Sequence, residues 1–307
     1  MTTWLITGCS SGLGRHLAHA VLQAGFNAVV TARNAATVHE IAAAYPDRAV
    51  AAVLDVTDRA QVDVAVELAH TRFGSVDVLV NNAGHGYRAA VEEADELEVA
   101  ALFASNFFGA VSTIKAVLPG MRARRTGTIV NVSSIAGRLA MPGSAYYSAT
   151  KFALEGLSDA LRKEVEPLGI KVMIVDPGAF RTEFAGRSLK QAKANIADYA
   201  ATAGPRRKEN DHSHGTQPGD PARAATAIIQ AVAGPRMPFR LLLGSDAVRI
   251  VAAELADQVA EIEEWKALSA STDFPDDQCY RWNFATCAVF LPSPRNCISL
   301  ARQNDCI

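Results

Sequence analysis

The sequence has few of the residues that would place the protein outside the ordinary globular classes. It has five cysteines, none in a C-x-x-C pair, and four of them (Cys279, Cys287, Cys297 and Cys306) lie near its end. This usage indicates reduced thiols in the cytoplasm, with neither a disulfide framework nor a metal site. Lysine plus arginine (30) nearly balance aspartate plus glutamate (32). Nothing in this balance favours nucleic acid or an anionic membrane as a partner.

Long uninterrupted apolar runs are lacking as well. The most apolar long stretch, VAALFASNFFGAVSTIKAVLPG, contains Asn106 and Lys115, which favours a buried helix over a membrane span. The first residues, MTTWLITG, have neither a basic segment nor a cleavage site, so we expect no signal peptide. Hydrophobic residues make up 49% of the chain and charged residues 20%, which is ample for a buried core.

What the sequence does contain is a regular alternation of short apolar runs with amphipathic stretches at helical spacing. Several runs are unbroken rather than alternating, which is typical of strands buried on both faces. The repetition predicts an α/β fold, a single Rossmann-type doubly wound parallel sheet with helices on both faces. The carboxyl ends of its strands would share the edge where ligands bind. The predicted strands span residues 3–7, 27–32, 49–56, 76–83, 127–134 and 170–177.

The pattern weakens after residue 185. We expect a helix over 186–200 and an exposed loop over 204–221, where GPRRKENDHSHGTQPGDP is rich in turn formers and charge. The remaining expectations are a helix over 221–232, a strand over 239–244 and a helix over 246–268. From about residue 277 the chain has no clear period, and the sequence leaves open how this tail relates to the fold.

A glycine-rich turn directly follows the first predicted strand. In TGCSSGLGRHLA, Thr7, Gly8, Gly12 and Gly14 lie where the strand gives way to a helix. Glycine permits positive φ there and lets a diphosphate approach the backbone, and the N–H groups that begin the helix favour that anion. The spacing is T-G-x-x-x-G-x-G rather than G-x-G-x-x-G, so alone it is weak evidence. The intervening candidates for the same site are Ser10, Ser11 and Leu13.

The same letters fit a second hypothesis. The segment GCSSG (8–12) also satisfies G-x-S-x-G, the nucleophile elbow of serine hydrolases, with Ser10 as the nucleophile. However, the motif lies on the first strand, so no earlier strand–helix loop supplies the usual oxyanion donor. The last two histidines, His212 and His214, lie in the charged loop rather than after a late strand. Both points favour the diphosphate site.

The end of the second strand indicates which dinucleotide would bind. In VVTARN, the position that is acidic in NAD-binding folds holds Ala32, and Arg33 follows. A carboxylate would repel a 2′-phosphate, whereas a guanidinium binds it bidentately. Arg33 therefore favours NADP(H) over NAD(H), against the alternative of a solvated surface arginine. Asp55 and Val56, at the end of the third strand, would flank the adenine.

Two adjacent tyrosines and a lysine form the candidate catalytic group. In SAYYSATKFAL, Tyr147 and Lys151 share one helix face, and Tyr146 points elsewhere. A phenol with a pKa near 10 is a poor base at neutral pH, and a nearby ammonium would lower that pKa by about 1–3 units. Such a tyrosine exchanges a proton with a carbinol or carbonyl oxygen. The alternative is a buried core tyrosine beside a lysine that reaches solvent.

Two serines end the fifth predicted strand, on the edge where ligands bind. They are Ser133 and Ser134 in NVSSIAG. A hydroxyl at this place can hydrogen-bond a substrate oxygen. The glycine turn, the serines and the tyrosine would then share one edge of the sheet, which is what gives the isolated Y-x-x-x-K pattern its weight.

Taken together, these motifs resemble the short-chain dehydrogenase/reductase family. The matching segments are TGCSSGLG (7–14), NNAG (81–84), SNFFG with Asn106, VSS (132–134), YSATK (147–151) and PGAFRT (177–182), in the family's order and approximate spacing. The resemblance implies one NADP(H)-binding and catalytic domain over 1–276, with a variable substrate region at 186–245. The cysteine-rich tail, 277–307, departs from the family pattern, which puts the C-terminal boundary in question rather than the chemistry.

The resemblance also implies a role for each matching residue. Tyr147 would be the proton donor or acceptor, and Lys151 would lower its pKa and bind the nicotinamide ribose. Ser134, thirteen residues before Tyr147, would position the substrate oxygen. Asn106 would hold a water that links Lys151 to solvent. The adenine-ribose side would be supported by Asn82, Ala83 and Gly84, and the nicotinamide would be cradled by Pro177, Gly178, Phe180 and Thr182.

The implied activity is that of an NADP(H)-dependent oxidoreductase acting on a carbonyl or secondary alcohol. The alternatives are an NADP(H)-binding protein without turnover and the serine hydrolase. The nearest resemblance is to hydroxysteroid-dehydrogenase-like members, which with the apolar residues of 180–245 suggests a hydrophobic small-molecule substrate such as a steroid, retinoid or aryl ketone. Those residues are Phe180, Phe184, Tyr199, Met237 and Phe239. In this family, helices like those near 100–120 and 147–166 pair across subunits, which implies a homodimer or homotetramer.

Four other residues receive structural interpretations. His212 and His214 are interpreted as part of a solvated loop rather than a metal site. Cys9 is interpreted as a packing residue within the glycine turn. His85, directly after NNAG, is interpreted as a neutral loop histidine at the border of the substrate cleft.

Overall fold

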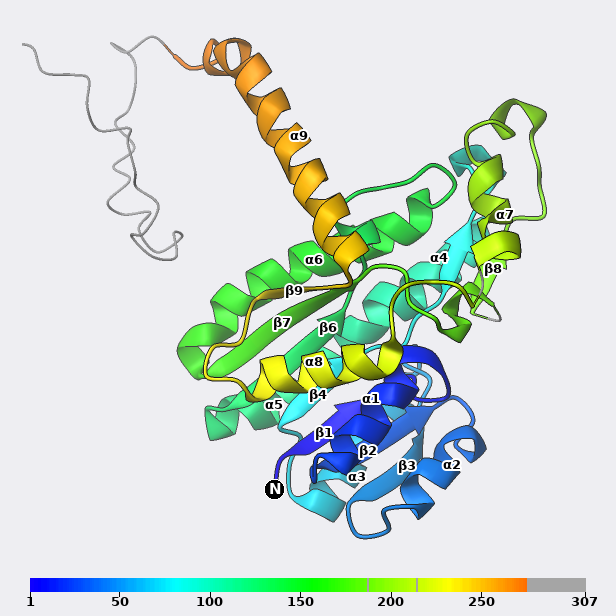
Figure 1. The fold of residues 1–307 in the computed structure, drawn as a ribbon. Coiled ribbons are helices and arrows are strands. Elements are labelled where there is room, and N and C mark those ends of the chain that lie inside the picture. The colour runs from blue at the N-terminus through cyan, green and yellow to red at the C-terminus, as the bar shows by residue number, and fades with distance from the viewer. Residues whose placement is uncertain (187, 214, 275–307) are drawn as a thin grey trace, which may run out of the picture. The chain divides into compact units, whose positions relative to one another are not determined.

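The computed structural model describes residues 1–186, 188–213 and 215–274 (Figure 1). The chain divides into two compact units, Met1–Ala256 and Asp257–Ile307. All of the sequence motifs lie in the first unit. The predicted tail, residues 277–307, lies outside the described residues.

In the described residues, seven parallel strands form the main sheet in the order β3-β2-β1-β4-β6-β7-β9. The order reverses between β1 and β4, so the carboxyl ends of these two strands flank the point where doubly wound sheets bind ligands. This topology confirms the predicted fold class. The strands are β1 (Thr3–Ile6), β2 (Asn27–Ala32), β3 (Ala49–Val53), β4 (Val78–Asn81), β6 (Gly127–Val132), β7 (Ile170–Pro177) and β9 (Arg240–Leu243).

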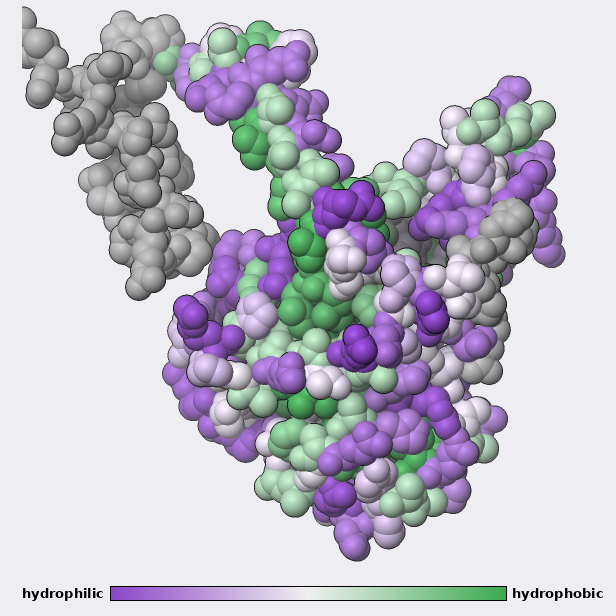
Figure 2. Space-filling model, viewed as in Figure 1, coloured by the Kyte–Doolittle hydropathy of each residue, from purple (hydrophilic) through white to green (hydrophobic). Residues whose placement is uncertain are grey.

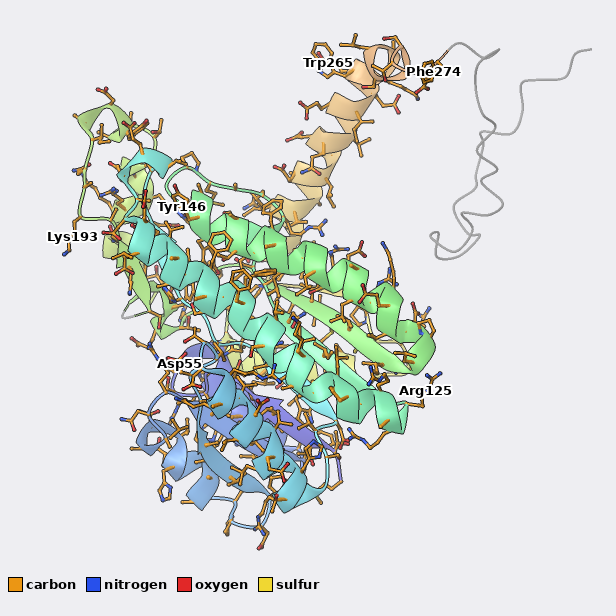
Figure 3. The ribbon with its side chains drawn as sticks, turned by 180° about the vertical axis from the view of Figure 1, so that it is seen from behind. Asp55, Arg125, Tyr146, Lys193, Trp265 and Phe274 are labelled. Carbon is orange, nitrogen blue, oxygen red and sulfur yellow. The ribbon has the colours of Figure 1, made fainter. Side chains whose placement is uncertain are left out.

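Helices cover both faces of the sheet (Figures 1 and 3). One face packs against α1 (Gly12–Gln23), α2 (Ala36–Ala43) and α8 (Pro221–Ala233). The other packs against α3 (Arg59–Phe73), α5 (Gly109–Arg124) and α6 (Ala145–Val165). Every residue of β1 and β2 is buried, because both faces of these strands are covered. Burial of this apolar surface is the main stabilising contribution to the fold.

Shorter elements surround the carboxyl edge of the sheet. A two-stranded parallel sheet joins β5 (Gly86–Arg88) to β8 (Leu189–Gln191). Helix α4 (Glu96–Phe103) runs through a π-helical turn, Ala104–Phe108, into α5. The other helices are η1 (Val91–Glu93), η3 (Ile135–Gly137), η4 (Glu166–Leu168), η5 (Glu183–Ala185), η6 (Ala197–Tyr199), α7 (Gly204–Ser213) and α9 (Ser245–Ala270).

Two predictions for the variable region are wrong. The helix expected over 186–200 is absent from the described residues of that range, where β8 pairs with β5 and only the short η6 is helical. The loop expected over 204–221 begins with α7, which the charge-rich sequence did not indicate. Tertiary contacts decide both segments: Glu209 of α7 forms an ion pair with the largely buried Arg88 at 2.9 Å, and Arg207 forms one with the buried Glu93.

Among the described residues, one helical run, Glu96–Arg124, is long and apolar enough to cross a membrane, with a mean hydropathy of 1.5. The buried residues Ile114, Val117 and Met121 of this run belong to the core beneath the sheet. Length and composition alone are weak evidence for a span, since helices in a protein core can be equally long and apolar.

The described part of the second unit, residues 257–274, is mainly the second half of α9. Its apolar side chains are exposed, including Val259 (60%), Ile262 (65%) and Trp265 (53%). Figure 2 shows green hydrophobic and purple hydrophilic residues interspersed along this helix.

Candidate active site

The glycine-rich turn joins β1 to α1 at the carboxyl edge of the sheet. Gly8 (φ 73°) and Gly12 (φ 57°) have left-handed backbone conformations that favour glycine. Ser11 precedes α1, and in the described structure its side chain makes no capping hydrogen bond. The first turn of α1 contains no acidic residue. The residues present therefore fit a diphosphate, because the N–H groups that begin the helix face no competing carboxylate or cap.

Asn82 fixes this turn to the neighbouring strand. Its amide donates to the carbonyl oxygens of Thr7 (2.9 Å) and Gly8 (3.1 Å). The Thr7 hydroxyl in turn accepts hydrogen bonds from the N–H groups of Asn82 (2.9 Å) and Ala83 (3.0 Å). A Cβ on Gly14 would overlap both the Asn82 amide and the Gly8 carbonyl. The motifs TGCSSGLG and NNAG are thus parts of one rigid structure.

The segment after β7 forms the opposite wall of the site. Thr182 lies over the glycine turn, since a Cβ placed on Gly12 would be 3.5 Å from the Thr182 Cβ. Phe180 forms an isolated β-bridge with Gly219. Pro177 ends β7, which brings the whole PGAFRT segment to the same sheet edge.

Asp246, in the first turn of α9, holds this segment in place, although it belongs to none of the sequence motifs. Its carboxylate accepts a hydrogen bond from the Ala179 N–H at 2.8 Å. A Cβ on Gly178 would overlap the same carboxylate, which explains the need for glycine there. An aspartate near the start of a helix is a recognisable signal. Nothing in the sequence, however, links it to a loop 67 residues away.

The ends of β2 and β3 form the third side of the site. Arg33 follows β2 and is exposed, and it makes no ion pair among the described residues. The Asp55 carboxylate accepts hydrogen bonds from the N–H (3.0 Å) and hydroxyl (2.7 Å) of Thr57, and Val56 is buried. Figure 3 shows Asp55 and Tyr146 at the same edge of the sheet, with Arg125 at the opposite edge.

The predicted catalytic side chains come together at this edge. The Tyr147 phenol forms a hydrogen bond with the Ser134 hydroxyl, and Ser134 also accepts one from the Ala136 N–H at 3.1 Å. Lys151 Nζ lies 5.7 Å from the centre of the Tyr147 ring. It donates a hydrogen bond to the Val132 carbonyl at 2.9 Å, which anchors the ammonium to the end of β6. Helix α6 begins at Ala145, two residues before the range 147–166 given above, and Tyr147 and Lys151 share one face, as predicted.

The acidities of these groups differ from the sequence-based expectation. Burial raises the pKa of Tyr147 to about 12, and the Ser134 hydrogen bond and the Arg206 charge only partly oppose it. Burial also lowers the pKa of Lys151 to about 8, while Asp176 and Glu155 oppose that shift. The predicted lowering of the phenol pKa is therefore wrong for this state of the protein. Removal of the phenol from water raises its pKa by more than the nearby ammonium lowers it. Burial also disfavours the charged form of that ammonium.

Asn106 lies in the π-helical turn between α4 and α5. Its side chain accepts from the His85 N–H (3.0 Å) and donates to the His85 carbonyl (2.9 Å). A weaker contact at 3.4 Å joins it to the Thr150 hydroxyl, next to Lys151. A Cβ on Gly84 would lie 3.0 Å from the Asn106 amide oxygen. The π turn thus aims a buried amide at the NNAG segment and at α6, a use that π turns often have.

Comparison with known proteins agrees with this geometry. The family model described as short chain dehydrogenase matches residues 2–193. The chain belongs to this family. It is 37% identical to oxidoreductase BOA17 of Botryotinia fuckeliana, over 88% of this chain and 98% of that one. It is 40% identical to a 3-ketodihydrosphingosine reductase of Bacteroides thetaiotaomicron, over 78% and 87%.

Solved structures of the same family share the fold. A short-chain dehydrogenase from Streptomyces avermitilis is 45% identical, with a TM-score of 0.83 over 89% of this chain and 100% of that one. An alcohol dehydrogenase from Thermococcus sibiricus, complexed with 5-hydroxy-NADP, is 27% identical, with a TM-score of 0.65 over 79% and 96%. A Burkholderia phymatum member complexed with NAD is 24% identical, with a TM-score of 0.74 over 85% and 95%. Nicotinamide cofactors of both kinds therefore bind within the family.

The surroundings of Tyr147 in this short-chain dehydrogenase are largely apolar. The Phe184 ring lies 5.6 Å from the Tyr147 ring. Tyr146 and Tyr147 pack against a small buried cluster of Tyr87, Ala89, Leu102 and Ala192. The Tyr146 hydroxyl donates to the Val91 carbonyl at 3.2 Å, away from Lys151. This placement agrees with the interpretation of Tyr146 as a packing residue.

The remaining candidates behave as structural residues. Cys9 is fully buried, and burial raises the pKa of its thiol to about 12. The His85 ring contacts the Ser105 hydroxyl at 3.1 Å, and burial lowers its pKa, which agrees with a neutral histidine. Within the described residues, no hydrogen bond joins Ser10 to a histidine, and no group that could hold a metal ion is present. The side chains of His212 and His214 lie outside the described part of the structure.

Proposed function

We propose that the protein is an NADP(H)-dependent oxidoreductase that transfers hydride between nicotinamide and a carbonyl or secondary alcohol. The observation that carries the proposal is the Tyr147–Ser134 hydrogen bond, with Lys151 one turn away, at the edge that also holds the glycine turn. We assign the activity to residues 1–276.

A bound nicotinamide cofactor supplies or accepts hydride at its C4 atom. The chain itself handles the proton and orients the substrate. Tyr147 donates its proton to the carbonyl oxygen during reduction, and Ser134 hydrogen-bonds the same oxygen. Lys151 lies beside the phenol, where its positive charge favours the phenolate left behind. A phenol with a pKa of about 12 keeps its proton at neutral pH, so Tyr147 has a proton to donate.

The exposed Arg33 supports NADP(H) as the cofactor. It directly follows β2, where the usual acidic position holds Ala32, and it makes no ion pair among the described side chains. Its guanidinium is free to bind a 2′-phosphate. The complex of the Thermococcus sibiricus relative with an NADP derivative is consistent with this choice.

The apolar wall formed by Phe184 and the Tyr87 cluster supports a hydrophobic substrate. The relative named as a 3-ketodihydrosphingosine reductase is consistent with a keto group as the site of reduction. We also propose that the protein forms a homodimer or homotetramer through α5 and α6. Phe108, just before α5, is 60% exposed, and Phe152 of α6 is 45% exposed. Light scattering after size exclusion tests the assembly.

One set of assays tests the function. NADPH and NADH are titrated into the purified protein by fluorescence, and NADPH oxidation is followed with aldehydes, aliphatic ketones, aryl ketones and steroid ketones. We expect tighter binding of NADPH and turnover with an apolar ketone. Tight NADPH binding with no turnover on any compound would favour a non-enzymatic binding protein. Labelling of Ser10 by a fluorophosphonate would favour the serine hydrolase.

A further inference from the structure

Two carboxylic acids lie buried next to Lys151, and the family motifs give a role to neither. Glu155 follows Lys151 by one turn of α6 and is 6% exposed. Asp176 is the residue of β7 before Pro177 and is 0% exposed. Carboxylates are almost never buried this deeply unless each has a partner, so their surroundings require an explanation.

The two acids differ in the partners they have. One oxygen of Glu155 accepts a hydrogen bond from Arg240 Nε of β9 at 2.8 Å and lies 3.5 Å from the Arg138 guanidinium that follows η3. The other Glu155 oxygen and both Asp176 oxygens are buried, and no N–H or O–H donor reaches them in the described part of the chain. Three carboxyl oxygens therefore lack donors in one place.

A single proton between the two acids satisfies two of these three oxygens, one on each acid. Asp176 and Glu155 lie within hydrogen-bonding reach of each other, but two ionised carboxylates have no hydrogen to share. If one acid is protonated, it donates to the other. Paired carboxylates that share a proton are a known solution where two like charges cannot both ionise.

Close packing holds this pair against the catalytic segment. A Cβ on Gly137 of η3 would lie 2.6 Å from Ser133 Oγ, 3.1 Å from Glu155 Cγ and 3.2 Å from the Lys151 carbonyl carbon. The Ser133 N–H donates to the Val175 carbonyl at 2.8 Å, which places Ser133 beside Asp176. The acids therefore lie next to Ser133, which precedes Ser134, and to the turn of α6 that carries Lys151.

The charges around the pair agree with this arrangement. The charged groups that face it are Lys151 on the same helix, Arg138 after η3 and Arg240 on β9. Burial, then the charge and hydrogen bond of Glu155, raise the pKa of Asp176 to about 8, and the two arginines oppose the shift. The charges of Asp176 and Glu155 in turn raise the pKa of Lys151 and so favour its protonated form.

We propose that Glu155 and Asp176 are positioning residues that share one proton and keep the Lys151 ammonium charged beside Tyr147. The proposal rests on the proposed oxidoreductase function only for its catalytic consequence. As the pH rises through about 8, Asp176 loses its proton and the pair gains a second negative charge. That charge stabilises the ammonium, so Lys151 stays protonated to higher pH than its burial alone would allow.

The variants Asp176→Asn, Glu155→Gln and the double variant separate the two acids. Asp176→Asn keeps an amide for Glu155 to bind but removes the second charge, so Lys151 should lose its proton at lower pH. Glu155→Gln removes the like charge beside Asp176, so the pKa of Asp176 falls. Asp176 is then ionised at lower pH, and its negative charge takes the place of the one lost from Glu155. We therefore expect a small effect from Glu155→Gln and the largest from the double variant. Asp159→Asn, one turn along α6 and paired with Lys163 at 2.9 Å, is the matched control.

Two measurements need no substrate. Infrared difference spectra between about pH 6 and about pH 10 should show a protonated carboxyl band in the parent protein that Asp176→Asn removes. Carbon-13 NMR titration of labelled lysine, assigned with Lys151→Met, should show the Lys151 protonation constant about tenfold weaker in Asp176→Asn, a fall of about one pKa unit. Circular dichroism checks that each variant is folded. If Asp176→Asn is not, Glu155→Gln tests the shared proton instead, because it should move the loss of the carboxyl band to lower pH.

Turnover then tests the catalytic consequence. With a ketone that the NADPH screen identifies, the alkaline loss of kcat should move to lower pH in Asp176→Asn and further in the double variant, but not in Asp159→Asn. Absence of the carboxyl band, or an unchanged Lys151 titration in the double variant, would overturn the proposal. A shifted titration with an unshifted kcat profile would also overturn the positioning role. If no ketone is reduced, the proposed function fails, while the spectra still decide the pair.

Discussion

The Asp246 carboxylate and the Ala179 N–H form a 2.8 Å hydrogen bond that joins the start of α9 to the loop after β7. The same carboxylate packs against Gly178 so closely that no side chain fits there. The loop carries Thr182, which lies over the glycine turn. Asp246 therefore determines the position of one wall of the proposed cofactor site without belonging to any motif.

Asp246→Ala should weaken NADPH binding by about 5- to 10-fold, because a hydrogen bond to a charged group contributes about 1.5–3 kcal/mol, part of which water replaces. Fluorescence titration with NADPH measures the change. Asp257→Ala, at an exposed position on the same helix, is the control and should bind NADPH as the parent does. Equal affinities for the parent and Asp246→Ala would show that the loop holds its position without this contact.

The glycine turn should not tolerate a methyl group at Gly14. A Cβ there meets the Asn82 amide and the Gly8 carbonyl, so Gly14→Ala must displace the contact that joins β1 to β4. We expect a loss of about 1–3 kcal/mol in the free energy of unfolding and no measurable NADPH binding. Gly156→Ala is the matched control, since a Cβ on that α6 glycine has no atom within 4 Å. That change should stabilise the helix by about 0.4–1 kcal/mol.

Arg33 should control the choice between the two dinucleotides. Arg33→Ala should weaken NADPH binding by about tenfold or more and leave NADH binding nearly unchanged, because a charge-assisted pair with the 2′-phosphate contributes about 1.5–3 kcal/mol. Arg122→Ala, exposed in the last turn of α5 at the far end of the sheet, should alter neither affinity. If the ratio of NADPH affinity to NADH affinity is unchanged in Arg33→Ala, Arg33 does not determine the choice of cofactor.

The two tyrosines should differ sharply in their effect on turnover. Tyr147→Phe removes the phenol that contacts Ser134, and kcat for ketone reduction should fall by about 10²- to 10⁴-fold, the usual range for a general acid. Tyr146→Phe loses only a hydrogen bond to the Val91 carbonyl and should keep kcat within a few-fold. The opposite ranking of the two variants would mean that the other phenol transfers the proton.

The sequence predicted the parts of the molecule that local pattern controls. Apolar runs predicted each of the first six strands of the main sheet to within a few residues, and α6 lies within two residues of the range 147–166 expected for it. Contacts between distant residues were not predictable in this way. The ion pair of Arg88 with Glu209 stabilises α7 in a segment whose composition indicated a loop. Likewise, the direction of the Tyr147 pKa shift depends on how deeply the phenol is buried, which no spacing reveals.

Lys151 should reduce the stability of the folded protein at neutral pH. Its pKa is about 8 in the folded state and 10.5 in its ordinary state, so below about pH 8 both states are protonated and burial of the charge carries its full cost. Between these values the unfolded chain binds more protons, so the stability of the parent rises with pH. Lys151→Met removes the charge but leaves the Val132 carbonyl without its donor. We expect a net gain of about 1–2 kcal/mol near pH 7 that shrinks as the pH rises towards about 10.

Urea denaturation of Lys151→Met and its parent at several pH values tests this expectation. Lys163→Met, on the exposed side of α6 with its surface partner Asp159, should show little difference from the parent, because an exposed ion pair contributes little to stability. A Lys151→Met protein less stable than its parent near pH 7, or a difference that stays constant with pH, would contradict the prediction. A stabilised but inactive Lys151→Met variant would show that the buried ammonium is kept for turnover at the expense of stability.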